Sequence, residues 1–225
     1  MALYPAEIAQ NQAETPHLRR IALTVPPFVT ASHRRAGQYI QLQIGQHIGF
    51  FALSGAPGRP VELLVKPGGG AAAALAALCA GAPVETSAVQ GKGYPLEECA
   101  GRDLVALAAG SGIAPIRALI DTVRADRTRY RKVTVFYGQR HADEFAFASE
   151  HEHWARDGIE LIRVLSAPSA QWAGPVGHVQ DALLQMAPPL DEAAAFLCGM
   201  KPMVAAATEA LVRCGLAKER VHLNF

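Results

Sequence analysis

The chain has 225 residues, of which 50% are hydrophobic and 18% are charged, and its formal net charge at pH 7 is +1. A chain of this length and apolar content can bury a core without disulfides or metals, so disordered, collagen-like and disulfide-stapled classes are excluded. The balanced charge gives no reason to expect a nucleic-acid partner.

Cysteine spacing and the chain start give expectations about metals and location. No Cys-x-x-Cys pair is present, which argues against zinc ribbons and Cys-ligated iron–sulfur clusters. His151 and His153 have no further ligand nearby, so we expect no metal site. No signal peptide and no membrane-spanning stretch is recognisable, so we expect a cytoplasmic protein with free thiols. The four cysteines are Cys79, Cys99, Cys198 and Cys214.

The first 100 residues contain short apolar runs separated by turn formers, a pattern typical of strands. The run over residues 39–44 alternates apolar and polar side chains, as a strand with one solvated face does. An Ala-rich segment over residues 71–80, preceded by three glycines, predicts one helix. Short strands with a single helix indicate an antiparallel β-barrel over residues 1–100. We predict its strands over residues 21–25, 39–44, 48–53 and 61–65.

After about residue 102 the pattern becomes strand, turn and helix, repeated. Alternating units of this kind fold as a parallel sheet covered on both faces, which predicts an α/β domain over residues 101–225. Ligands of such sheets bind beyond the carboxyl ends of the strands. We predict strands over residues 104–109, 133–137, 159–165, 194–198 and 221–223, and helices over 113–124, 145–154, 179–185 and 201–214.

The strongest motif is Ala109-Gly110-Ser111-Gly112-Ile113-Ala114-Pro115, which joins a predicted buried strand to a predicted helix. Glycines in such a turn let the backbone approach a pyrophosphate, and the helix start offers free N–H groups and a positive dipole end. Pro115 suits the first helical turn, where its missing N–H costs nothing. The alternative is a βα turn whose glycines serve packing alone.

A second turn of the same kind covers residues 196–203, where Cys198 ends a predicted strand and a helix follows. In a parallel sheet this position faces the ligand crevice. The alternative is a buried structural thiol, which is the usual environment of a free cysteine.

Together with Phe136-Tyr137-Gly138-Gln139-Arg140 and the terminal Val221-His222-Leu223-Asn224-Phe225, these turns resemble the motifs of the ferredoxin–NADP reductase family, in the same order. The resemblance covers essentially the whole chain. It implies a flavin-binding barrel, with FAD favoured over FMN, followed by a domain that binds NAD(P)H.

The resemblance also assigns roles to residues of the second half. It places the pyrophosphate of NAD(P) on Gly110, Ser111, Gly112, Ile113 and Pro115, and the adenosine near Tyr137, Gly138 and Arg140. Cys198 and Phe225 are the expected catalytic residues: Cys198 positions the nicotinamide without acting as a nucleophile, and Phe225 lies against the flavin. An alternative for Phe225 is a hydrophobic plug. Gly199, Met200 and Met203 complete the turn beside the nicotinamide.

The flavin half departs from the family pattern. The family has Arg-x-Tyr-Ser on the flavin strand, whereas Gly49, Phe51 and Ala52 stand at the Arg, Tyr and Ser positions here. The missing arginine removes a charge-assisted phosphate contact. The flavin contacts that we expect on this strand and on the following glycine segment are Phe50, Phe51, Ala52, Leu53, Ser54, Lys66, Gly69, Gly70 and Ala72, with Lys66 as the replacement cation and Ala72 lacking the family's hydroxyl.

The expected function is a flavin-dependent oxidoreductase that passes a hydride from NAD(P)H to flavin N5 and then electrons to a separate protein or small molecule. The choice between NADH and NADPH stays open, because Arg140 serves equally as a 2′-phosphate ligand or as a solvated cation. The alternative function is a nucleotide-binding electron-transfer subunit or sensor with a degenerate flavin site and little turnover.

Overall fold

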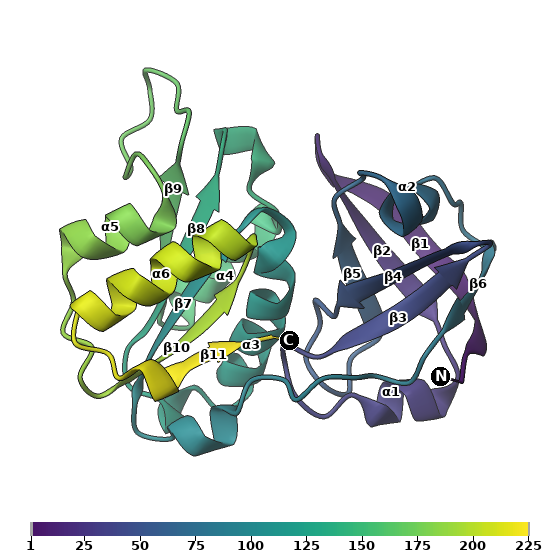
Figure 1. Ribbon diagram of the computed structural model, residues 1–225, viewed down its shortest axis with the longest axis horizontal. Helices are drawn as coiled ribbons and strands as arrows, with labels where there is room; N and C mark the ends of the chain where they lie inside the picture. Colours follow the sequence, from purple (N-terminus) through teal and green to yellow (C-terminus); the bar gives the residue numbers. More distant parts are fainter. Residues whose placement is uncertain (1, 225) are drawn as a thin grey trace.

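The computed structural model describes residues 2–224, which form two units side by side (Figure 1). The first unit is a six-stranded antiparallel sheet with the strand order β4-β3-β6-β1-β2-β5. A bridge between Leu53 and Leu63 brings its two edges together and gives the unit its barrel shape. Its elements are β1 (Tyr4–Thr15), β2 (Leu18–Thr24), α1 (Pro27–Ser32), β3 (Tyr39–Ile44), β4 (His47–Ala52), β5 (Val61–Val65), α2 (Gly70–Ala76) and β6 (Pro83–Thr86).

The predicted antiparallel barrel is confirmed, and all four predicted strands are present. β1, β6 and α1 were not predicted. The helix predicted over residues 71–80 is shorter, because its carbonyls find other partners: the Asn11 side chain donates to the carbonyl oxygens of Ala76 and Leu78 at 3.2 and 2.6 Å. The chain then turns at Gly81, where φ is +85°.

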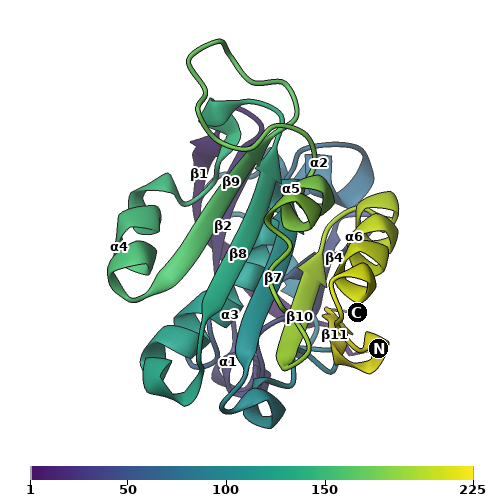
Figure 2. The same cartoon turned by 90° about the vertical axis from the view of Figure 1, so that its left-hand side faces the viewer.

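The second unit is a five-stranded parallel sheet with the order β11-β10-β7-β8-β9, which confirms the predicted α/β class. Two separate apolar cores show that α3 and α4 cover one face and α5 and α6 the other (Figure 2). The elements are β7 (Asp103–Ala109), α3 (Ile113–Ala125), β8 (Val133–Gln139), α4 (His151–Arg156), β9 (Ile159–Leu165), α5 (Val179–Met186), β10 (Ala193–Cys198), α6 (Lys201–Arg213) and β11 (Val221–Leu223).

The helix predicted over residues 145–154 is wrong over most of its length. Residues 142–144 and 148–150 form 3-10 turns, and α4 begins only at His151. Phe145 and Phe147 are both buried, two residues apart, and a continuous helix would point them about 200° apart. The chain buries both by bending at Phe147, which adopts φ +58°.

The connection between the units runs over residues 87–102 and includes Tyr94, whose side chain is fully buried. The Tyr94 hydroxyl donates to the carbonyl oxygen of Leu197 at 3.2 Å, and its ring meets that of Phe196 edge to face at 5.2 Å. The last barrel strand ends at Thr86 and the first parallel strand begins at Asp103. We therefore keep residue 100 as a proposed domain boundary.

Within residues 2–224, no helix is long and apolar enough to cross a membrane. In the same range, no group of three or more His, Cys, Asp or Glu side chains is arranged to hold a metal ion.

Candidate functional site

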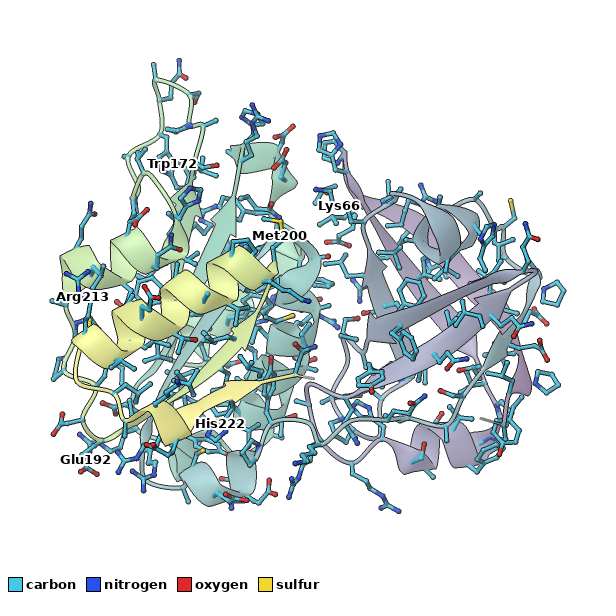
Figure 3. All side chains as sticks on the ribbon, viewed as in Figure 1. Lys66, Trp172, Glu192, Met200, Arg213 and His222 are labelled. Carbon is cyan, nitrogen blue, oxygen red and sulfur yellow. The ribbon has the colours of Figure 1, made fainter. Side chains whose placement is uncertain are left out.

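A cavity of about 880 Å³ lies where the barrel meets the carboxyl ends of β7, β8 and β10. Its walls come from both units: Lys66 of the barrel and Met200 of the α/β unit line it and lie on its two sides (Figure 3). This is the edge at which open α/β sheets bind ligands. The predicted site residues that line the cavity are Lys66, Gly110, Gly138, Arg140, Met200 and Met203.

The turn from β7 to α3 presents its backbone to this cavity. Gly110 adopts φ +60°, and apart from its chain neighbours no heavy atom of residues 2–224 lies within 4 Å of the position that a β-carbon would occupy there. Gly110 to Gly112 form one 3-10 turn that leads directly into α3, and no side chain caps these first amides. The open side at Gly110 leaves room for an anionic group at the start of the helix.

Gly112 has a different reason to be glycine. A β-carbon there would overlap the carbonyl oxygen of Cys198, at the end of β10. The two turns that the sequence singles out are therefore in direct contact at one edge of the sheet. Ile113 and Pro115 are buried beneath the turn and support it from inside.

Tyr137 also supports the turn from inside the protein. Its side chain is fully buried, and its hydroxyl donates to the carbonyl oxygen of Gly110 at 3.4 Å while accepting from Gln139 Nε2 at 2.7 Å. Burial raises the pKa of Tyr137, so the phenol stays protonated and remains a donor. Its side chain is absent from the cavity lining, whereas the neighbouring Gly138 and Arg140 belong to it.

Cys198 lies at the carboxyl end of β10, behind the cavity lining. Burial raises the pKa of its thiol to about 12, so the sulfur is a neutral thiol at physiological pH. A neutral thiol is a poor nucleophile, and this state suits a group that only shapes the space beside a ligand. Beyond it, the Met203 side chain packs on Gly199 so closely that a β-carbon would lie 2.7 Å from its sulfur. Phe225, predicted against the flavin, lies outside the described residues.

Arg140, His17 and His178 line the end of the cavity near β8. Within residues 2–224, no acidic side chain pairs with the guanidinium of Arg140. Glu144 is already engaged, since it accepts from the backbone N–H of Arg140 at 3.1 Å and lies 3.6 Å from His17. His178 lines the same end. This part of the cavity therefore suits an anionic ligand.

Neither His17 nor His178 is predicted as a site residue from the sequence. His17 lies in the turn between β1 and β2, and β1 itself was not predicted. His178 precedes α5 and forms a capping box with Asp181, whose carboxylate accepts from the His178 backbone N–H at 2.9 Å. That spacing of His178 and Asp181 is the one local signal that marks the start of the helix.

The barrel side of the site has no room for the arginine of the family pattern. A β-carbon on Gly49 would lie 2.7 Å from the β-carbon of Ala71 and 2.8 Å from the ring of Phe51. α2 thus packs directly on β4, and the half-buried ring of Phe51 occupies the space over Gly49. Phe51 and Ala72 pack against the barrel core. A cation at residue 49 would require this packing to open.

The remaining predicted flavin contacts differ in what they offer. Phe50 is 63% exposed, while the side chains of Leu53 and Ser54 are buried, and the backbone N–H groups of these two residues already donate to the carbonyl oxygens of Gln38 and Glu62. Gly69 and Gly70 are exposed, and within the described part of the chain only their own sequence neighbours lie within 4 Å of the position of a β-carbon at either one. The exposed Phe50 ring and the two glycines fit a flavin held by apolar contacts and main-chain groups, with Lys66 as the cation in the same connection.

Comparison with known proteins agrees with this arrangement. Residues 106–209 match the oxidoreductase NAD-binding domain. A ferredoxin NADP+ reductase from Neisseria gonorrhoeae, solved with bound FAD and NADP, superposes with a TM-score of 0.83 at 20% identity and covers all of both chains. The match to the oxidoreductase NAD-binding domain supports the predicted resemblance to the ferredoxin–NADP reductase family, and the superposition confirms the predicted two-domain fold.

Two curated relatives match most of this chain. The fruit protein pKIWI502 of Actinidia deliciosa is 26% identical over 82% of this chain and 64% of its own length. A CDP-6-deoxy-L-threo-D-glycero-4-hexulose-3-dehydrase reductase of Yersinia pseudotuberculosis is 25% identical over 96% of this chain and 67% of its own. The chain thus spans about two thirds of the length of these relatives.

Proposed function

We propose that the chain is an NAD(P)H-dependent flavin oxidoreductase that works in electron transfer to a separate acceptor. The observation that carries this proposal is the cavity between the units. Gly110, Met200 of the turn over residues 196–203 and Lys66 of the barrel all line it. A flavin bound beside this cavity, on β4 and the glycine segment of the barrel, supplies the chemistry of taking up a hydride and releasing electrons one or two at a time. The protein supplies binding, orientation and exclusion of water.

For the nucleotide, we propose that the open backbone at Gly110 and the start of α3 hold the pyrophosphate, together with Ser111 and Gly112. Arg140 lines the proposed adenosine end and is the candidate ligand for a ribose hydroxyl or a 2′-phosphate. The neutral thiol of Cys198, with Gly199 and Met203, shapes the nicotinamide end. Phe225 keeps its proposed place against the flavin on the family resemblance alone.

For the flavin, we propose that Phe50, Phe51 and the backbone of Ala52 contact the ring, and that Gly69 and Gly70 receive the phosphate. Charge-assisted hydrogen bonds are roughly twice as strong as neutral ones, and Lys66 is the single cation that we place at this phosphate. We therefore expect the flavin to dissociate more readily than from relatives that keep the arginine. FAD is favoured over FMN by the resemblance to the gonococcal reductase, which holds FAD.

The acceptor is proposed to be a separate protein or small molecule. The name of the Yersinia relative describes a reductase that serves a dehydrase. A second function is favoured by the closed space at Gly49: a subunit that binds the nucleotide and lacks turnover because the flavin site is degenerate.

The test begins with extraction and identification of the flavin from purified protein. It continues with anaerobic addition of NADH or NADPH to protein reconstituted with FAD or FMN. Bleaching of the flavin absorbance by either nucleotide supports the oxidoreductase. Protein that regains no flavin but binds a nucleotide supports the second function, and protein that binds neither overturns both.

A matched pair of variants assigns the nucleotide to the Gly110 turn. Ser111→Asp places a negative charge next to Gly110, in the turn where we propose the pyrophosphate, and Ser149→Asp adds the same charge at an exposed residue in the turn over residues 148–150. We expect roughly tenfold weaker nucleotide binding in Ser111→Asp and unchanged binding in Ser149→Asp, measured by calorimetric titration. Equal binding by both variants would move the nucleotide away from this turn.

A further inference from the structure

The largely buried guanidinium of Arg117 on α3 contacts both units. Its side chain is 12% exposed and donates four hydrogen bonds, two to each unit. Within the α/β unit, Nε and Nη2 bind the two carboxylate oxygens of Glu150, both at 2.8 Å. Across the interface between the two units (the seam), Nη1 donates to the carbonyl oxygen of Ser54 and to Glu62 Oε1, both at 3.0 Å.

The partners of Arg117 on the barrel are themselves tied together. Glu62 on β5 accepts a hydrogen bond from the Ser54 hydroxyl at 3.0 Å and one from Arg20 Nε at 2.7 Å. The Ser54 backbone N–H donates to the carbonyl oxygen of Glu62 at 2.8 Å. Ser54 is fully buried, so neither its carbonyl nor its hydroxyl has water as an alternative partner. Ser54 is thus held from two sides.

A buried aromatic ring completes the seam. The guanidinium carbons of Arg117 and Arg20 lie 4.6 and 5.5 Å from the ring centre of Phe147. The Phe147 backbone N–H crosses the seam as well, donating to Glu14 Oε1 of β1 at 2.6 Å. Burial disfavours the charged form of Arg117, but Glu150 and Glu62 raise its pKa above the ordinary value, so the guanidinium stays charged. The planar guanidinium is needed for these four hydrogen bonds, because a lysine ammonium has three donors and no fixed plane.

The position of Arg117 in the chain connects the two halves of the proposed site. It lies one turn into α3, the helix that begins directly after the Gly110 turn. Its acceptor Ser54 lies two residues after Ala52, the end of β4, where we place the flavin ring. One side chain therefore links the start of the nucleotide-binding helix to the end of the flavin strand through a single hydrogen bond of 3.0 Å.

We propose that Arg117 is a positioning residue that sets the separation of nicotinamide and flavin by fixing α3 on the end of β4, an inference that rests on the proposed function. Arg117 does not line the cavity, so it acts through Ser54 and Glu62. Hydride transfer requires the two reacting atoms at about 3–3.5 Å, and a displacement of about 1 Å costs roughly a hundredfold in rate. A shift of α3 against β4 changes this distance while leaving the nucleotide turn intact.

The test compares Arg117→Lys with Arg124→Lys. Arg124 is on the same helix and binds Asp121 and Asp157, both within the α/β unit. We expect Arg117→Lys to slow reduction of bound flavin by roughly tenfold to a hundredfold, with nucleotide affinity within about twofold of the wild type. Arg124→Lys is expected to change neither quantity. A rate for Arg117→Lys equal to that of Arg124→Lys overturns the proposal, as does a loss that appears only in nucleotide affinity.

A second measurement needs no flavin. Because Arg117 ties α3 to Ser54, addition of NAD+ or NADP+ to the flavin-free protein is expected to slow hydrogen exchange of the backbone amides of Leu53 and Ser54. In Arg117→Lys this effect is expected to disappear, while protection within α3 itself persists. Unchanged coupling in the variant contradicts the proposal even where the flavin binds poorly.

Chemical rescue separates a positioning role from a general loss of folding. A second cavity of about 590 Å³ borders Arg117, Arg20, Glu62 and Glu150 and gives a small molecule access to the vacated space. Arg117→Ala is expected to regain flavin reduction on addition of ethylguanidinium chloride, whereas ethylammonium chloride restores less. Equal recovery of flavin reduction with both salts overturns the assignment of this role to the planar guanidinium of Arg117. A wild-type protein that no nucleotide reduces refutes the proposed function instead.

Discussion

Gly112 and Cys198 are in such close contact that any side chain on Gly112 would overlap the carbonyl oxygen of Cys198. The contact joins the turn after β7 to the end of β10 and thereby fixes the spacing of the two turns that face the cavity. A parallel sheet brings the carboxyl ends of these strands to one edge, but this contact determines how closely their turns meet.

Gly112→Ala is therefore expected to lower the free energy of unfolding by about 1–3 kcal/mol, the usual cost of overpacking. Nucleotide binding should weaken too, since the turn must shift away from β10. Urea unfolding and calorimetric titration measure the two effects. Gly68→Ala, at a position where no neighbour lies closer than 4.0 Å, is the matched control and should be neutral or slightly stabilising. An equal stability of both variants would refute the packing argument.

A second prediction concerns the reactivity of the half-buried thiol of Cys198. With a pKa of about 12, roughly one thiol in 10,000 is ionised at pH 8, and the thiolate is the reactive form. We expect iodoacetamide to modify the exposed Cys79 well before Cys198, as followed by peptide mass spectrometry. Cys198→Ser should keep flavin reduction within about tenfold of the wild type, because no covalent step uses the sulfur. Rapid labelling of Cys198 would contradict the neutral-thiol assignment.

The sequence predicted the strands that carry strong local patterns and missed those that do not. β3 alternates apolar and polar residues, and its range is as predicted. β1 is 12 residues long but has only Ile8 and Thr15 buried, because it extends beyond the barrel as a hairpin with β2. Its pairing, with two register shifts, is determined by partners elsewhere in the chain, which local periodicity does not reveal.

The residues of the candidate site likewise divide into those that a local sequence pattern predicts and those that it does not. The Gly110 turn was found because phosphate-binding turns need glycine at defined positions beside a strand and a helix. Arg117 was not found, since a single arginine on an amphipathic helix is indistinguishable from a solvated one. Its partner Glu62 is 55 positions away in the sequence, and only the docking of the two units brings them together. The closed space at Gly49 likewise depends on where α2 packs.

Because of three histidines that are buried or half-buried, we expect the free energy of unfolding to decrease as the pH falls. Burial lowers the pKa of His33, His151 and His222 below the ordinary value of 6.5. For each one the unfolded state takes up a proton first as the pH falls, so stability is present above pH 6.5 and is lost between 6.5 and the lower folded pKa. Urea unfolding at pH 7.5 and 5.5 should show this decrease.

The His151 contribution can be isolated by substitution. His151 Nε2 lies 3.1 Å from the carbonyl oxygen of Ala146, and its ring packs near Trp154. His151→Gln has no proton to take up in this range, so its stability should change less between pH 7.5 and 5.5 than that of the wild type. The exposed His153 provides the control, and His153→Gln should retain the wild-type pH dependence. A steeper decrease in His151→Gln would reverse the sign that we assign.

Tyr94 links the connection between the units to the nucleotide edge, since its hydroxyl binds the residue before Cys198. Tyr94→Phe keeps the ring against Phe196 and removes only this hydrogen bond, which is expected to cost about 1 kcal/mol of unfolding free energy. Tyr130→Phe removes a comparable bond, 3.3 Å from the Tyr130 hydroxyl to the carbonyl oxygen of Leu96, at the other end of the sheet. Both variants should lose similar stability, and only Tyr94→Phe should weaken nucleotide binding, because it alone frees the end of β10. If titration shows equal nucleotide affinities for the two variants, the hydrogen bond from Tyr94 to Leu197 does not contribute to nucleotide binding. The buried hydroxyl then serves folding alone.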